Sequence, residues 1–383
     1  MLISGWSGHG AAGAYGVDVL TLADVTPSLL AALGVPGERA TLPVEPARSA
    51  CLLLVDGLGE HQLREHAADA PFLSSLAGDV LEVGFPATTA TSIASLGTGL
   101  PAGEHGITGC AFATEGQALH ALTWCSAEGT DLRETVVPEE VQPHDTALQR
   151  AAAAGLDVRV VAPAAQQRSG LTRAALRGGD FRSIHALGDL AAGVLAAPGF
   201  CYAYHGDLDL VGHVYGPGSL PWRLQLRLVD TLVAMIAEQL PPGALLAVVA
   251  DHGMVSLTDA VDADADERLT DGVRLITGEA RARHVHAVPG AAADVLATWR
   301  EVLGNRADVR SRAEAVAAGW FGPVVADAVL GRIGDVVAAA RGGAGVVRRV
   351  AEPRESQLVG HHGARDDAER LVPFLLVRGE EHG

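Results

Sequence analysis

The chain has 383 residues, of which 48% are hydrophobic and 4% aromatic, and its formal net charge is −18. The hydrophobic content is sufficient for a large core and excludes a disordered chain. A surface this acidic repels a phosphate backbone, so we expect no nucleic-acid scaffold among the partners. All 28 basic residues are Arg, which excludes Schiff-base and Walker-type lysine chemistry.

The sequence contains no pattern typical of a membrane or secreted protein. No apolar run reaches the length of about 18 residues that a membrane span needs. The first 20 residues lack the basic start of a signal peptide, and the four cysteines form no C-x-x-C pair. We therefore expect a cytoplasmic protein with reduced thiols and no membrane partner.

Short apolar runs typical of buried strands alternate along the chain with Ala-rich helical patterns. The clearest runs, 50–57 and 244–253, end in Asp-Gly and Asp-His-Gly. Further strands are expected at 80–86, 157–164, 199–207 and 371–379, and helices at 74–79, 144–155 and 222–240. This alternation predicts an α/β fold with a parallel sheet that is covered on both faces.

Residues 255–358 interrupt the alternation. They combine an acidic loop, a possible strand pair around 274–278 and 283–290, and Ala-rich helices, so we interpret them as an inserted lobe. Residues 111–150, with several polar turns, are interpreted as a small cap, and residues 1–383 as one domain. The acidic loop 261–272 has Glu267 where a calcium loop requires glycine, which favours a solvated loop over a calcium site.

Metal-ligating side chains follow the expected strands. Sites in parallel sheets lie beyond the carboxyl ends of the strands, so these side chains are expected to converge. Carboxylate with imidazole suits zinc or a similar divalent ion, and the number of ligands, one hydroxyl included, fits two ions. Two ions about 4 Å apart suit in-line displacement at phosphorus in an anionic ester. The candidates are Asp56, Asp209, His213, Asp251 and His252, with His361 and His362 ahead of the last strand.

A cluster of hydroxyls lies where the strand at 80–86 passes into a helix. The segment FPATTATSIASLGTG, residues 85–99, contains Thr88, Thr89, Thr91 and Ser92. A metal lowers the pKa of a bound hydroxyl enough to supply an alkoxide nucleophile. We expect one of the four to act in this way, helped by N–H groups at the helix start, and the others to cap the helix.

The ordered motifs LLLVDGLG, FPATTATSIASLGTGLPAGEHGI, DLDLVGHVYGPGS, VVADHGM and GHHG resemble the nucleotide pyrophosphatase/phosphodiesterase family of the alkaline phosphatase superfamily. They extend from residue 52 to residue 363. The resemblance implies an alkaline-phosphatase-like three-layer α/β/α sandwich with a mostly parallel central sheet and an inserted lobe.

The resemblance also implies a role for each site residue. Thr89, the Thr of F-P-x-x-T, would be the nucleophile, with Thr88 and Ser92 as alternatives. His362 is preferred to His361 because it directly precedes the Gly of the H-G motif. Cys110 stands where the family commonly has an Asn that binds a phosphoryl oxygen. The implied metal ligands are Asp56, Asp251 and His252 for the activating ion, and Asp209, His213 and His362 for the other.

The leading hypothesis is a two-metal phosphodiesterase or nucleotide pyrophosphatase that acts through a phospho-threonine intermediate on a small phosphorylated substrate. Zn²⁺ is the expected metal and Mn²⁺ the alternative. A phosphomonoesterase, phosphonate hydrolase or phosphomutase on the same scaffold remains open, as does a catalytically inactive metal-binding protein. Candidates for stacking a nucleotide base are Phe112, Trp124 and Tyr215. The sequence does not determine the oligomeric state.

Overall fold

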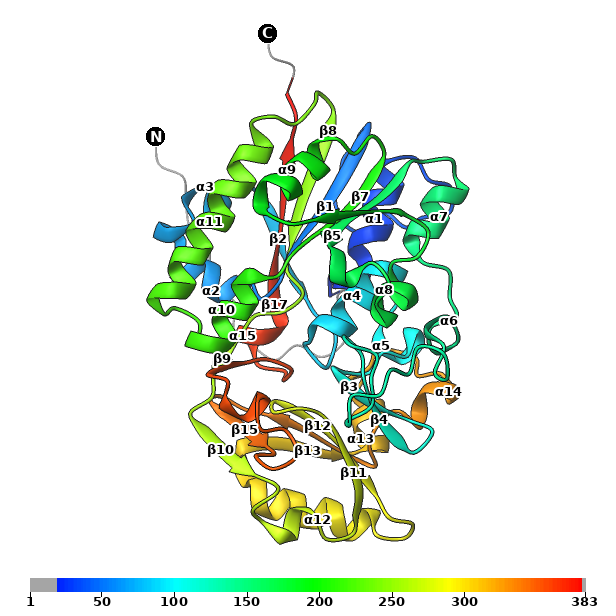
Figure 1. Ribbon diagram of the computed structural model, residues 1–383, viewed down its shortest axis with the longest axis vertical. Helices are drawn as coiled ribbons and strands as arrows, with labels where there is room; N and C mark the ends of the chain where they lie inside the picture. The colour runs from blue at the N-terminus through cyan, green and yellow to red at the C-terminus, as the bar shows by residue number, and fades with distance from the viewer. Residues whose placement is uncertain (1–18, 381–383) are drawn as a thin grey trace.

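The computed structural model describes residues 19–380; residues 1–18, which include most of the segment considered as a signal peptide, and 381–383 lie outside the described residues. A seven-stranded sheet forms the upper part of the molecule in Figure 1. Five adjacent strands, from β8 to β6, are parallel, whereas β17 is antiparallel to both of its neighbours. In spatial order the strands are β2 (Gly78–Glu82), β17 (Leu371–Arg378), β8 (Ala244–Val249), β1 (Ser49–Val55), β7 (Phe200–His205), β5 (Val158–Pro163) and β6 (Asp180–Ile184).

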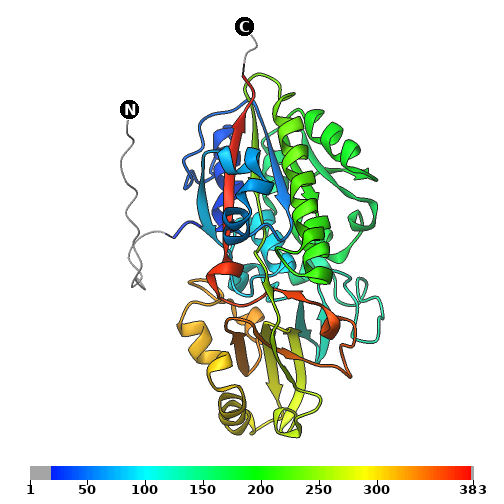
Figure 2. The same ribbon diagram turned by 90° about the vertical axis from the view of Figure 1, so that its left-hand side faces the viewer.

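Helices cover both faces of this sheet, which gives three layers (Figure 2). Strands β1 and β8 are buried on both sides and carry almost only apolar residues, as expected for the centre of a covered parallel sheet. One helical layer contains α1 (Val25–Ala32), α4 (Thr89–Thr98), α7 (Ala147–Ala153) and α8 (Gly170–Ala175). The other contains α3 (Pro71–Ser75), α9 (Leu187–Leu195), α10 (Asp207–Tyr215) and α11 (Leu220–Ala237).

The sequence-based expectations are confirmed for the α/β class, the central sheet and most of its strands. Two local expectations are wrong. The helix expected at 74–79 ends at Ser75, and Gly78–Glu82 forms β2, which pairs along β17. The strand expected at 80–86 therefore ends before Phe85 and Pro86. In both places the pairing with a distant strand, and not local propensity, decides the backbone conformation.

The lower part of the molecule in Figure 1 is built around a four-stranded antiparallel sheet. The expected strand pair is confirmed as β11 (Val273–Glu279) and β12 (Ala282–Ala287), and α12 (Ala292–Leu303) packs on this sheet around Trp299. The remaining strands of the sheet are β14 (Val336–Ala340) and β13 (Ala307–Ser311). We call residues 255–358 the lobe; its exact limits, the cap at 111–150 and the single-domain description stay predictions.

Smaller pairings connect the two parts. Strand β9 (Val255–Ser256), at the start of the lobe, pairs with β16 (Gly360–His361), which lies just beyond it, whereas β10 (Asp259–Asp262) and β15 (Ala344–Val347) pair within the lobe. The hairpin of β3 (Ala111–Thr114) and β4 (Gln117–His120) contacts β11. The other helices are α2 (Glu60–Glu65), α5 (Ala102–His105), α6 (Pro138–Val141), α13 (Arg312–Ala317), α14 (Asp327–Leu330) and α15 (Asp367–Arg370). Within residues 19–380, none of the helices has the length and apolarity needed to cross a bilayer.

Candidate active site

The candidate residues converge at the carboxyl ends of the three central strands. Asp56 directly follows β1, and Asp251 follows β8 after a single residue. Strand β7 ends at His205, and α10, which carries Asp209 and His213, begins two residues later. Because β1 pairs in parallel register with both β7 and β8, the three strand ends lie side by side. The common edge of the sheet is therefore the place where these side chains meet.

Three histidines at this edge are oriented alike: Nδ1 of each ring faces a backbone carbonyl, and Nε2 faces the other candidate ligands. Nδ1 of His213 lies 2.8 Å from the carbonyl of Gly360, and Nδ1 of His362 lies 3.0 Å from that of Ala87. Nδ1 of His252 is likewise 3.0 Å from its neighbouring carbonyl. A carbonyl oxygen only accepts, so Nδ1 carries the proton and the lone pair stays on Nε2. A hydrogen bond from one ring nitrogen to a carbonyl fixes the orientation of the ring and leaves the other nitrogen free to bind a metal.

A buried group forms around His252. Its Nε2 lies 3.4 Å from Asp56 Oδ1 and 3.6 Å from Asp251 Oδ2. The other oxygens of the two carboxylates are already bonded: Oδ1 of Asp251 accepts from the backbone N–H of Gly57, and Oδ2 of Asp56 accepts from the Tyr204 hydroxyl. One oxygen of each carboxylate thus faces the imidazole, and the three ligand atoms lie within 4.8 Å of one another. We call Asp56, Asp251 and His252 the buried group.

A second group lies on the side of α10. Asp209 Oδ2 is 3.3 Å from Nε2 of His213, and Asp209 Oδ1 is 4.0 Å from Nε2 of His362. The set within mutual ligand distance is Asp209, His362 and His252, whose ring stacks on that of His362 at 3.6 Å. His213 is not in this set and reaches it only through its contact with Asp209. The structure differs here from the predicted ligand sets, because His252 lies within ligand distance of both the buried carboxylates and the pair Asp209 and His362. We call Asp209, His213 and His362 the open group.

His361 lines the same pocket but, among the described residues, belongs to neither set of atoms within mutual ligand distance. Its Nε2 is 3.1 Å from the carbonyl of Leu358, in its own loop, and β16 ends at this residue. His362 follows immediately but turns its ring toward His252. This alternation along an extended chain separates two neighbouring histidines that the sequence left open as alternatives.

The four hydroxyls of the 85–99 segment have different partners. Thr91 donates to the carbonyl of Ile107, and Ser92 donates to that of Asp251. Thr88 precedes α4 but makes no capping hydrogen bond; it donates to Glu279 Oε2 at 3.3 Å. Thr89 differs from the other three, because its Oγ1 lies 3.2 Å from Nε2 of His252, one of the candidate metal ligands. The expectation that the remaining hydroxyls cap the helix is therefore wrong, because each has found another acceptor.

Thr89 is the first residue of α4 and is buried. The free N–H groups of the first turn and the positive end of the ten-residue helix lie beside its hydroxyl. An anion held next to Thr89 would therefore meet backbone donors as well as the histidine-carboxylate cluster.

The charge balance of the cluster favours binding of cations. Asp56 Oδ1, Asp209 Oδ1 and Asp251 Oδ2 are buried and have no hydrogen-bond partner among the described residues. Burial, followed by the charges of Asp251 and Asp209, raises the pKa of Asp56 well above its usual value. Crowded, buried and partly unbonded carboxylates are costly unless a cation accompanies them. Together with three Nε2 lone pairs, this donor set fits divalent metal ions.

The pKa values of the two histidines in the open group are shifted in opposite directions. Burial lowers the pKa of His213, but the hydrogen bond and charge of Asp209 outweigh it and raise the pKa to about 9. Burial, reinforced by His252 and His213, lowers the pKa of His362 well below its usual value. His362 is thus a neutral imidazole, the form that binds metals, whereas His213 would have to release a proton before it could bind one.

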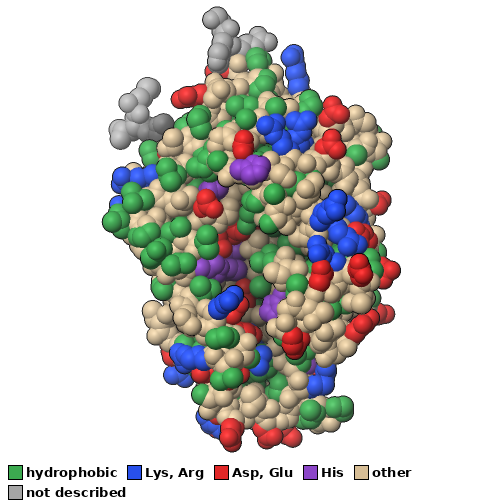
Figure 3. Space-filling model, in the orientation of Figure 1, with side chains coloured by type: hydrophobic (Ala, Val, Ile, Leu, Met, Phe, Trp, Pro, Cys, Tyr) green, Lys and Arg blue, Asp and Glu red, His purple; other side chains and the backbone are tan. Residues whose placement is uncertain are grey.

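A pocket of about 190 Å³ opens over Thr89 and the open group. Figure 3 shows histidine and acidic side chains gathered in the hollow between the sheet part and the lobe. The lobe contributes Glu279, Arg283, Glu352 and Glu355 to the pocket wall. Arg283 is engaged by Glu352 through two hydrogen bonds of 3.0 and 2.6 Å, which leaves Glu279 and Glu355 as carboxylates of the wall.

Sequence reasoning missed two residues next to the ligands. Tyr204, on β7, bonds Asp56, and Glu279, at the end of β11, lies 3.6 Å from His362 Nδ1. Burial raises the pKa of Glu279 to about 8. Tyr204 is the sixth residue of the expected strand GFCYAYHGD, near its carboxyl end, and that place could have indicated it. Nothing local points to Glu279, since its position depends on how the lobe folds over the sheet.

The residues considered for substrate binding have separate locations. Cys110 lines the pocket, and burial raises the pKa of its thiol, so it is a neutral, weak donor there. Phe112 and Trp124 are fully buried in the core, and Tyr215 lies exposed on α10. No Phe, Tyr or Trp is among the pocket-lining residues within the range 19–380. A stacking slot for a nucleotide base is therefore not supported at this pocket.

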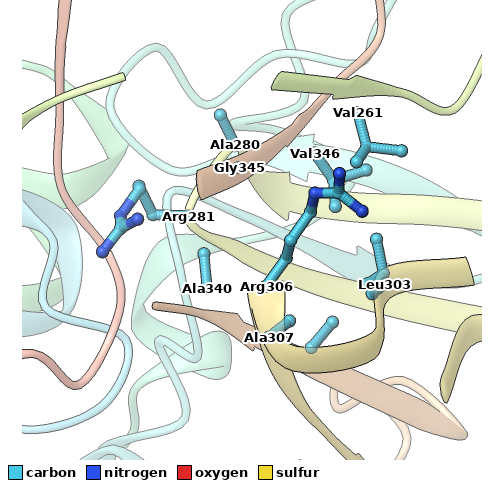
Figure 4. A pocket seen from close by; sticks show the side chains of 10 residues that line it. Val261, Ala280, Arg281, Leu303, Arg306, Ala307, Ala340, Gly345 and Val346 are labelled. Atoms are coloured by element: carbon cyan, nitrogen blue, oxygen red, sulfur yellow. The ribbon is translucent and has the colours of Figure 1, made fainter. Parts of the chain in front are cut away.

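A second cavity inside the lobe carries no comparable chemistry. It measures about 10 Å³ and lies between β15 and the lobe sheet, walled largely by aliphatic side chains such as Val261 and Val346 (Figure 4). Arg281 points away from it, toward Glu369 and Asp366 beside the last sheet strand. Arg281 therefore links the lobe to the sheet part.

The chain matches one protein family over most of its length. The family described as type I phosphodiesterase / nucleotide pyrophosphatase matches residues 50–365. The chain belongs to this family. The family lies within the alkaline phosphatase superfamily, whose members are metal-dependent, and the match supports a phosphoryl hydrolase. A search of curated protein sequences returns no match.

Solved structures share the fold at low identity. Murine ectonucleotide pyrophosphatase/phosphodiesterase 5 is 16% identical, with a TM-score of 0.65 over 86% of this chain and 88% of that one. An inactive variant of that murine protein, solved with AMP, is 15% identical, with a TM-score of 0.66 over the same shares. Phosphonoacetate hydrolase from Sinorhizobium meliloti 1021, solved with phosphonoacetate, is 19% identical, with a TM-score of 0.65 over 88% of this chain and 92% of that one.

Proposed function

We propose that this protein is a two-metal phosphoric ester hydrolase in which Thr89 is the nucleophile. The observation that carries the proposal is the contact between Thr89 Oγ1 and Nε2 of His252, inside a cluster of partnerless carboxylate oxygens. The buried group would hold one divalent ion and the open group the other, with Zn²⁺ preferred and Mn²⁺ as the alternative. When bound, the ions would lower the pKa of the Thr89 hydroxyl and offset the negative charge that develops on the phosphoryl oxygens.

The chain's own residues account for the remaining requirements of the reaction. The Thr89 hydroxyl gives up its proton and Oγ1 forms a bond to phosphorus as the bond to the leaving oxygen breaks. The leaving oxygen takes up a proton, which produces esterified phospho-Thr89 and an alcohol, phosphate or nucleotide product. Water then adds to the phosphorus, and Thr89 Oγ1 leaves with a proton to regenerate the hydroxyl. The N–H groups at the start of α4 would orient the phosphoryl oxygens through both steps.

The decisive experiment compares Thr89→Ala with Thr89→Ser on zinc-loaded protein, using bis-p-nitrophenyl phosphate. We expect Thr89→Ala to lose activity by on the order of 10³-fold or more while it keeps its zinc, because only the nucleophile is removed. Thr89→Ser retains a hydroxyl and should keep measurable turnover. Rapid quenching of the wild type followed by mass spectrometry should detect one added p-nitrophenyl phosphoryl group on the peptide that contains Thr89, because attack expels only one of the two p-nitrophenol groups.

Thr88→Ala is the matched variant at the neighbouring hydroxyl, which is bonded to Glu279. If Thr88→Ala abolished turnover and Thr89→Ala did not, the nucleophile would be Thr88. Full activity in both variants would require direct attack by water and would end the phospho-threonine proposal.

A second candidate is hydrolysis of small phosphonates or phosphomonoesters. It is favoured by the pocket, whose volume of about 190 Å³ and lack of aromatic lining among the described residues suit a small leaving group better than a nucleoside. One structural neighbour is a phosphonoacetate hydrolase, although the identity of 19% supports the fold alone.

A substrate panel separates these candidates. Zinc-loaded protein would be tested against bis-p-nitrophenyl phosphate, p-nitrophenyl phosphate, dinucleotides, nucleotide sugars and phosphonates. A higher kcat/KM for diesters supports a phosphodiesterase, whereas a preference for phosphonates or monoesters supports the second candidate. Absence of turnover on the entire panel, with zinc bound, would support a metal-binding protein without catalysis.

A further inference from the structure

Helices α10 and α11 expose a continuous apolar face, although they are surface elements. Seven side chains that are between 39% and 68% exposed form it, three on α10 and four on α11. We call this set the α10–α11 face. Its members are Leu210, Val214, Tyr215, Leu220, Leu224, Leu228 and Met235.

Helix α11 is apolar on two sides. Its inner side buries Trp222, Leu226 and Val229, which pack in the main core. The outer leucines recur every four residues, at 220, 224 and 228, so they line one side of the helix. A surface helix normally turns polar residues outward, as α12 of the lobe does with Asp294, Arg300 and Glu301. Packing of the inner side in the core explains why α11 forms part of the fold. The apolar residues on the outer side make no contribution to that packing and need another explanation.

Two charged residues of α11 beside the face are paired with a carboxylate from another part of the chain. Arg223 and Arg227 both bind the buried carboxylate of Asp69, at 2.6 Å each. They flank the leucines without separating them. Figure 3 shows hydrophobic side chains gathered on the side of the molecule where Figure 1 places α10 and α11. Apolar patches of this extent on a soluble surface mark interaction sites.

We propose that the α10–α11 face binds the same face of a second copy, so that the protein is a symmetric homodimer. From their exposed fractions, the seven side chains present on the order of 700 Å² of surface, close to the roughly 800 Å² that each partner contributes to a standard interface. Two helices from each copy would pack as two layers, the arrangement of a four-helix bundle. This inference is independent of the proposed phosphoryl chemistry.

A second copy is favoured over a membrane as the occupant. A twofold interface brings together identical patches, so an apolar face automatically meets an apolar face. A net charge of −18 disfavours anionic lipid, and the two arginines next to the face are already paired with Asp69. The second copy is also present wherever the chain itself is present.

The test measures the mass of the full chain in solution by light scattering and sedimentation velocity over a wide concentration range. We expect the wild type to have the mass of two chains, and the double variant Leu224→Glu/Leu228→Glu to have the mass of one. Val350→Glu is the matched control, because Val350 is 82% exposed but lies in the lobe, and it should keep the mass of two chains. Circular dichroism checks that all three proteins are folded.

Two outcomes would overturn the proposal: a wild type of one-chain mass at every concentration, or an unchanged two-chain mass in the double variant. If the double variant unfolds, Leu220→Gln/Leu224→Gln provides the same comparison with a smaller perturbation. Hydrogen exchange of the wild type adds a second measurement, in which dilution should increase exchange in α10 and α11 only. A one-chain wild type that dimerises after deletion of residues 1–18 would assign the face to that segment instead.

Discussion

The buried group and the open group use the same ligand chemistry but differ in how the fold holds them. Side chains of the buried group are at most 3% exposed and follow the ends of central strands. In the open group, Asp209 is 14% and His213 21% exposed, and both are carried by α10. Strands locked into a covered sheet move little, whereas a helix at the surface next to a pocket can adjust.

The difference teaches that the two proposed metal positions need not be equivalent. Backbone N–H groups of Gly57 and His252 both bond Asp251 Oδ1, so the buried group is fixed even without a metal. The open group faces the pocket, where substrate and water arrive. This contrast supports a tightly held ion next to Thr89 and a more exchangeable ion on the substrate side.

The largest expected effect comes from Asp251→Asn in the buried group. The change removes a carboxylate charge from a site where no described neighbour replaces it, so we expect loss of the ion beside Thr89. Turnover should fall by roughly 10³-fold or more, with no rescue by added zinc. Steady-state kinetics with metal analysis by mass spectrometry measures both quantities.

His213→Gln is the matched change in the open group. We expect a loss of roughly 10- to 100-fold that is largely restored by excess zinc, because this group is accessible and its other ligands remain. Equal, unrescued losses in both variants would contradict the distinction between a fixed and an exchangeable ion.

Metal removal should make stability strongly dependent on pH. Glu279, with a pKa of about 8, and His213, with a pKa of about 9, bind protons more tightly in the folded chain than at their ordinary values of 4.5 and 6.5. The folded state then holds more protons than the unfolded one, so the free energy of unfolding should fall as the pH rises from 6.5 to 9. Urea denaturation of chelator-treated protein tests this.

Zinc should reverse the effect, since bound cations favour the charged carboxylates and the neutral histidine. At a free concentration of about 100 times Kd, each ion should raise the free energy of unfolding by about 2.7 kcal/mol. If the free energy of unfolding of the metal-free protein increased over the same pH interval, the pKa values of Glu279 and His213 would not be raised in the folded chain, and this prediction would be wrong.

Tyr204→Phe tests the support behind the buried group. It removes the hydroxyl that donates to Asp56 Oδ2 and leaves the ring in place. We expect zinc affinity or turnover to fall by about 10- to 100-fold, the usual effect of losing an outer-shell hydrogen bond. Tyr202→Phe is the control on the same strand, because the buried Tyr202 hydroxyl has no hydrogen-bond partner among the described residues. Similar losses in both would assign the effect to packing.

The smallest effect is expected at Cys110, on the pocket side. Cys110→Asn supplies a stronger donor at a position that lines the same pocket as Thr89. One added hydrogen bond is worth about 1 kcal/mol, so kcat for phosphodiesters should rise by roughly 5-fold. Cys110→Ala, which lacks a donor, should not show this increase. A decrease in Cys110→Asn would mean that the pocket binds its substrate without a donor at this position.

Much of the fold could be predicted because its signals are local. Apolar runs that end in Asp-Gly and Asp-His-Gly indicate β1 and β8, and their polar ends mark the edge where Asp56 and Asp251 lie. The errors around Ser75–Glu82 arise where a short, weakly apolar segment takes its conformation from pairing with β17. β6 was missed for the same reason, since its side chains are half-exposed and it forms by pairing with β5.

The chain by itself determined the family, the α/β class and the ordered set of ligand types, because strand-end motifs and their spacing are properties of neighbouring residues. The tertiary structure alone decided that His252 contributes to both ligand sets, that Glu279 reaches Thr88 from the lobe, and that α11 leaves an apolar side uncovered. These features join residues separated by a hundred or more positions, or depend on what is left unburied, and no local period or propensity encodes such contacts.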